Sequence, residues 1–206
     1  MGLSLESMAI EMPAVFGHPN RVAFRGVLTV VDVVSDKAPS GARGHRVMLT
    51  RKAAEKAIPS LLGMALDYSP RFDAHDTRRK IGVITRADIA GRELEVSGFL
   101  YGRDFPEIVE EIGKTAVSRQ PSAFRNDGAG SADKSLPTPE RAKAARSGDP
   151  GVRTTHATLG MSYEIADAVV EDIKATVWVL NRVTFTGAAV LRRDKAAYRS
   201  TWIELG

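Results

Sequence analysis

A predicted β-hairpin in the middle of the chain constrains the fold more than any other feature of the sequence. Residues 81–89 and 93–101 are two strand-like runs that flank a short turn at 90–91. In the second run, apolar residues such as Leu94 and Val96 alternate with polar ones. Period-two alternation beside a short turn predicts two antiparallel strands with one face toward a core. We therefore expect antiparallel sheet to form the framework of the fold.

Further strands and two short helices are expected around this hairpin. Residues 22–34, 161–170 and 173–186 are rich in β-branched residues and predict strands. Helices are predicted over 51–62 and 105–112. These elements predict an α+β fold in which a mainly antiparallel sheet is flanked by helices.

Both predicted helices have suitable capping residues at their expected ends. Thr50 can cap the first helix, and Asp104 can cap the second, with Glu107 in the capping-box position. Gly113 is expected to close the second helix, because glycine accepts the backbone conformation found at helix C-termini.

Composition changes along the chain divide it into three parts. Residues 1–20 are expected to form an N-terminal arm, and residues 116–156 a linker-like insertion rich in Gly, Pro, Ser and Asp. The segments 21–115 and 157–206 are expected to form one β domain together. So long a segment inside a compact domain is usually functional or disordered.

Composition also excludes several classes of function. The chain has no cysteine, which excludes disulfides, thiolate metal sites and a cysteine nucleophile. The net charge of +4 is spread along the chain with few aromatic residues, so we expect no nucleic-acid partner. No apolar run is long enough to span a membrane, and the first residues lack a secretory signal pattern. A cytoplasmic location is therefore expected.

Two short stretches carry the candidate chemistry. His75 lies on a polar loop between Asp73 and Asp76, just before a predicted strand, and Ser162 begins another strand. A loop histidine beside aspartates is more often a surface residue than a catalyst, and serines in strands are common. No metal-ligand spacing accompanies His75, so neither a metal nor a cofactor is expected. Glu164 replaces the last glycine of the Gly-x-Ser-x-Gly elbow, which argues against a hydrolase of that class.

The order of these elements resembles that of the prohead maturation proteases of tailed phages, which are distantly similar to the herpesvirus assembly proteases. In that family a histidine precedes an Ile-Gly-Val strand, as His75 precedes residues 81–83. The nucleophile follows a Leu-Gly-hydrophobic step, as Ser162 follows residues 159–161. The last strand carries a third active-site residue, and Asn181 is its counterpart here.

The resemblance implies a small closed or strongly curved β-barrel and a serine endopeptidase with His75, Ser162 and Asn181 in its site. It implies that the protein cleaves capsid and scaffold precursors within an assembling procapsid in the host cytoplasm. The protein would then belong to an oligomer or a larger assembly and have no membrane partner. Asn181 adds no charge to such a site. Asp73, Asp76 or Glu164 are alternative sources of a carboxylate, although their closeness in sequence to His75 or Ser162 argues against good geometry.

Asn181 and the long insertion keep a second hypothesis open. The chain could instead be a catalytically impaired structural protein of the phage particle, such as a minor capsid or tail component retained in the virion. The two hypotheses differ in whether Ser162 reacts.

Overall fold

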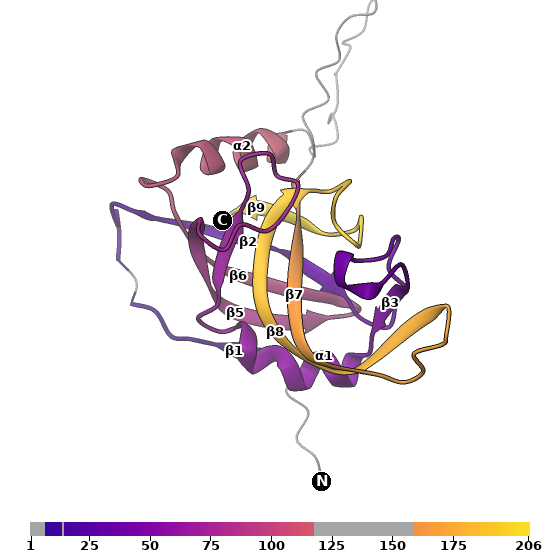
Figure 1. Cartoon of the computed structure of the whole chain (residues 1–206). Helices are drawn as coiled ribbons and strands as arrows, with labels where there is room; N and C mark the ends of the chain where they lie inside the picture. Colours follow the sequence, from indigo (N-terminus) through magenta and orange to yellow (C-terminus); the bar gives the residue numbers. More distant parts are fainter. Residues whose placement is uncertain (1–6, 14, 118–158) are drawn as a thin grey trace, which may run out of the picture.

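The computed structural model describes residues 7–13, 15–117 and 159–206, which form mostly β-structure (Figure 1). The strands of this part are β1 (Ser7–Ala9), β2 (Arg21–Val30), β3 (Arg46–Leu49), β4 (Ala65–Tyr68), β5 (Lys80–Ala90), β6 (Glu93–Tyr101), β7 (Leu159–Val170), β8 (Val177–Arg192) and β9 (Trp202–Leu205). The helices are α1 (Arg51–Ala57) and α2 (Pro106–Val117), with 3-10 turns η1 (Ser40–Ala42) and η2 (Ile58–Leu61). The helices lie at opposite ends of the sheet (Figure 1).

The nine strands form one open mixed sheet, so the expectation of a closed or strongly curved barrel is wrong. The order is β3-β8-β4-β5-β6-β2-β9, with β1 beside β5 and β7 beside β8. Closure would require the two end strands to pair with each other, but β3 pairs with β8 and β9 pairs with β2. Both end strands are only four residues long, and each forms ladder hydrogen bonds with one neighbouring strand. The sheet is mixed because β8 pairs in parallel with β3 and β4, while the other strand pairs are antiparallel.

The central hairpin is formed as its alternation predicts. β5 and β6 are antiparallel, with Ile89 opposite Leu94 and Ala87 opposite Val96, and these four side chains are buried. Gly98 lies opposite Ile84 at a point where a Cβ atom would overlap the backbone of β5. Glycine there lets the two strands approach at normal spacing.

The start of α1 follows its predicted signal, while both ends of α2 differ. α2 begins at Pro106, and the carboxylate of the predicted cap Asp104 accepts a 2.8 Å hydrogen bond from Asn20 Nδ2. Thr50 caps α1, and its hydroxyl accepts a hydrogen bond of 3.2 Å from the Ala53 N–H. α2 continues past Gly113 to Val117, so the predicted stop at this glycine is wrong. Ile108 and Ile112 are fully buried, one turn apart on the core side of the helix. Their burial stabilises the helix across the glycine.

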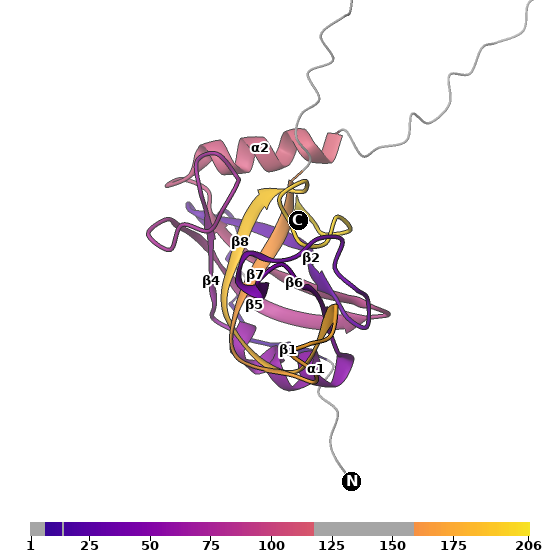
Figure 2. The same cartoon turned by 45° about the vertical axis from the view of Figure 1, so that its right-hand side comes forward.

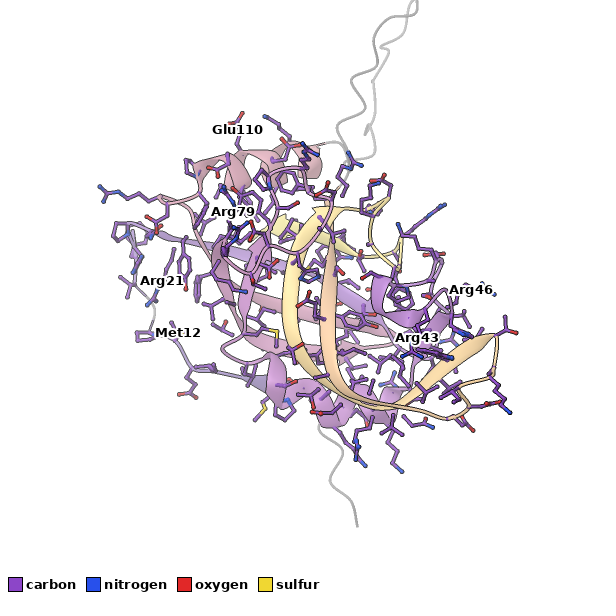
Figure 3. The ribbon with its side chains drawn as sticks, in the orientation of Figure 1. Met12, Arg21, Arg43, Arg46, Arg79 and Glu110 are labelled. Carbon is purple, nitrogen blue, oxygen red and sulfur yellow. The ribbon has the colours of Figure 1, made fainter. Side chains whose placement is uncertain are left out.

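The predicted arm and insertion differ in how much of them the structure describes. Part of the 1–20 segment belongs to the sheet, because β1 pairs with β5 from Ser7 to Ala9. Met12, further along this segment, lies at the edge of the molecule (Figure 3). The predicted insertion at 116–156 lies outside the described residues from 118 onward.

Candidate functional site

The candidate site forms where β4 and β7 flank β8 (Figure 2). The loop at 69–79, which carries His75, connects β4 to β5 and folds back toward β8. The Arg192 N–H, at the end of β8, donates a 2.8 Å hydrogen bond to the Phe72 carbonyl. Arg79, at the other end of the loop, lies on the side of the molecule where Glu110 of α2 lies (Figure 3). The loop is therefore held against the strands that carry the other candidate residues.

One row of residues crosses the three strands at this point. Asp67 of β4 pairs with Ala189 of β8, and Ala189 pairs with Ser162 of β7. Paired residues in neighbouring strands project from the same face of a sheet, so the side chains of Asp67 and Ser162 share a face. Two inter-strand spacings place their Cα atoms roughly 10 Å apart. Between them lies only the methyl group of Ala189, which leaves room for a further side chain.

This row faces away from the main core. The adjacent residues Leu66, Ala188 and Met161, which project to the opposite face, belong to the large hydrophobic cluster. Asp67 and Ala189 are nevertheless fully buried. On this face, His75 and Asp76 of the 69–79 loop contact the Asp67 side chain.

His75 lies over this row and meets two carboxylates. Its Nδ1 atom is 3.5 Å from Oδ1 of Asp67 and 3.9 Å from Oε1 of Glu164. The His75 side chain is 15% exposed, and both ring nitrogens are buried without a hydrogen-bond partner among the described residues. The contact with Asp67 is longer than an ordinary hydrogen bond. Catalytic hydrogen bonds of this length commonly tighten when substrate binds.

Asp67 is held as a buried carboxylate. Its Oδ1 accepts a 3.2 Å hydrogen bond from the Asp76 N–H, and its Oδ2 lies 3.3 Å from Nζ of Lys80. Burial alone would raise the pKa of Asp67, but His75 and Lys80 outweigh it and lower that pKa below its ordinary value. The side chain is thus ionised at neutral pH and faces the imidazole with a full negative charge.

A cleft of about 530 Å³ adjoins Ser162 and Glu164. Its wall includes a run of β7 and is completed from the η1 region, β8 and the C-terminal segment; the lining includes Ala42, Val47, Met161, Ile165, Trp178 and Tyr198. In the described part of the chain, β7 pairs only with β8, so the other edge of β7 has no neighbouring strand. The cleft is mostly apolar and open to solvent beside a partly exposed serine.

The residues predicted from sequence are only partly brought together. His75 lies against the row that contains Ser162. Asn181 is exposed on β8, eight residues from Ala189, which corresponds to roughly 26 Å along a strand. The carboxylate beside His75 is Asp67, which the sequence reasoning missed. The signal was present: Asp67 is a charged residue inside the short apolar run at 63–68.

The other histidines have local roles or lie outside the described residues. Nδ1 of His18 accepts hydrogen bonds from two backbone N–H groups, and His45 stacks on Trp178 with ring centroids 4.6 Å apart. His156 lies outside the described residues. Within the described ranges, no group of three or more His, Cys, Asp or Glu side chains could hold a metal ion.

Comparisons with known proteins leave the family of this chain open. No protein-family model matches the sequence, and no curated protein is significantly similar to it. Among the described residues, no helix is long and apolar enough to span a membrane.

Proposed function

We propose that this chain is a serine endopeptidase in which Ser162 is the nucleophile, His75 the general base and Asp67 the carboxylate that orients the base. The observation that carries this proposal is the row Asp67–Ala189–Ser162, with the His75 ring against its buried acid. A buried carboxylate, an imidazole beside it and a partly exposed hydroxyl in the same row of the sheet are the groups that acyl transfer by serine requires.

In the proposed mechanism, His75 acts as a base and then as an acid in each half-reaction. The Asp67 carboxylate accepts a hydrogen bond from the Nδ1–H of His75, which leaves Nε2 unprotonated and able to accept the Ser162 proton. The Ser162 oxygen then attacks the peptide carbonyl carbon. His75 returns the proton to the leaving amine as the C–N bond breaks, which leaves an acyl-enzyme. Water, deprotonated by His75, releases the acid and restores Ser162.

The cleft beside β7 supports a peptide substrate bound in an extended form. The Met161 N–H points away from β8, because it donates a 3.3 Å hydrogen bond to the Thr201 hydroxyl. By strand alternation, the N–H and C=O of Tyr163 point the same way, toward the unpaired edge. An extended peptide can add to such an edge through main-chain hydrogen bonds while its apolar side chains enter the cleft.

We further propose that the substrates are capsid and scaffold precursors cleaved during phage head assembly. This rests on the resemblance in the Ile-Gly-Val strand at 81–83 and the Leu-Gly-Met-Ser step at 159–162. It implies that the chain works inside a larger assembly. It also implies that the protein acts in the host cytoplasm, within the procapsid.

Cleavage of a complex peptide library by the full chain tests the proposed chemistry. The purified protein and its Ser162→Ala variant are incubated with proteome-derived peptides, and new peptide termini are identified by mass spectrometry. We expect new termini with the wild-type chain and none with Ser162→Ala. Equal cleavage by both proteins, or no cleavage by either, would refute a serine peptidase and favour the structural protein of the phage particle.

A further inference from the structure

Glu164 is a second carboxylate directed at the same nitrogen that Asp67 approaches. Its Oε1 atom lies 3.9 Å from Nδ1 of His75, and its side chain is 48% exposed. Glu164 and Ser162 are two residues apart on β7, so they project from the same face. The imidazole is therefore flanked by an acid from β4 and another from β7.

Gly187 makes room for the Glu164 side chain. Glu164 pairs with Gly187 across β7 and β8. A Cβ atom at position 187 would lie 2.9 Å from Oε2 and 3.3 Å from Cβ of Glu164. An alanine there would force the Glu164 side chain to move, so the glycine permits its present position against β8.

Glu164 differs from the other acids around His75 because its charge is not offset by a lysine or arginine. Asp67 pairs with Lys80, and Asp76 of the loop pairs with Arg78 and Arg79. The Asp73 carboxylate accepts a hydrogen bond from the Ser69 hydroxyl, and the charges of Arg71 and Arg192 also act on it. In the part of the chain that the structure describes, the only ion-pair partner of Glu164 is His75.

We propose that Glu164 is a positioning residue that holds His75 and stabilises the imidazolium formed when Ser162 loses its proton. The proposal rests on the proposed function and adds a second acid to it. A negative charge at this distance attracts the positive charge that forms on the ring during the reaction. Its partial exposure moderates the effect through solvent screening.

The NMR signals of the His75 ring test this role without any substrate. These signals, assigned by comparison with a His75→Gln variant, are recorded at neutral pH in the full chain and in Glu164→Gln. Loss of the charged contact 3.9 Å from Nδ1 should move the His75 ring signals. Gly187→Ala should move them as well, because the added methyl group displaces the Glu164 side chain. Glu171→Gln, the same substitution in the exposed turn after β7, should leave them unchanged.

Activity gives the second readout. Glu164→Gln should reduce kcat about three- to tenfold, whereas Glu171→Gln should leave kcat unchanged. His75 ring signals in Glu164→Gln that coincide with those of the wild-type chain would overturn the proposal, whether or not the chain cleaves peptides. Displaced ring signals in a chain without Ser162-dependent cleavage would support the contact between Glu164 and His75 while refuting the proposed function.

Discussion

Replacing Asp67 by asparagine removes the charge that orients His75 while preserving the shape of the side chain. The new amide oxygen can still accept from the Asp76 N–H, which Oδ1 of Asp67 now does. The amide nitrogen, in contrast, offers no acceptor to Lys80. Because the Lys80 side chain is 40% exposed, we expect a loss of only about 1–2 kcal/mol in the free energy of unfolding. The variant should therefore fold.

The effect of Asp67→Asn on Ser162 should be far larger than its effect on stability. In the chymotrypsin-type triad, the same change lowers turnover roughly ten-thousand-fold, because it favours the wrong imidazole tautomer. Glu164 still faces Nδ1 of His75 in the variant, 3.9 Å away. We therefore expect a smaller loss here, about a thousandfold, which corresponds to about 4 kcal/mol in the activation free energy.

The rate at which a fluorophosphonate labels Ser162 measures this loss, since the probe needs no knowledge of the natural substrate. Asn181→Ala is the matched control, because Asn181 is exposed and lies along β8 away from Ala189. It should label within about twofold of wild type. Labelling of Asp67→Asn at the wild-type rate would refute the role of Asp67. A large loss of labelling rate in Asn181→Ala would show that Asn181 is the third residue of the site.

Three further predictions concern stability. Gly98→Ala should lower the free energy of unfolding by about 3 kcal/mol in denaturant titrations, because the new methyl group overlaps the Val83 carbonyl and the backbone must shift; an unchanged midpoint would contradict the close strand approach. Tyr198→Phe should cost about 1–2 kcal/mol by the same measurement, because the buried hydroxyl lies 3.2 Å from two backbone carbonyls. The pKa of Asp67 is lowered in the folded chain, so its stabilising effect is complete above the ordinary value of 3.8 and is lost as pH falls through the folded pKa. The stability gap between wild type and Asp67→Asn should therefore shrink below about pH 3.8, and a gap that widens in acid would contradict this sign.

Local signals in the sequence predicted local structure well. The hairpin of β5 and β6 followed from alternation beside a short turn, and the start of α1 followed from Thr50 as a cap. The stop predicted at Gly113 failed because tertiary burial of Ile108 and Ile112 outweighs the intrinsic cost of a glycine. Helix ends depend on packing that a single segment does not reveal.

Sheet closure and the third site residue depended on long-range register, which the sequence does not encode locally. The open order of the sheet follows from which strands pair with β8, a strand that contacts β3, β4 and β7. The same register places Asp67, more than ninety residues from Ser162 in the chain, two strands away in space. The resemblance singled out His75 and Ser162 but gave the third position to Asn181 in the last strand. The buried Asp67 in an apolar run was the better indicator.

The most direct test of the account is whether His75 activates Ser162. The full chain, His75→Gln and Ser162→Ala are treated with a fluorophosphonate at neutral pH, and the adduct is located by peptide mass spectrometry. The account predicts one adduct on Ser162 in the wild-type chain, a loss of labelling rate of at least about a thousandfold in His75→Gln, and no adduct in Ser162→Ala. Labelling of Ser162 at the same rate in His75→Gln, or no labelling of Ser162 in the wild-type chain, would contradict it.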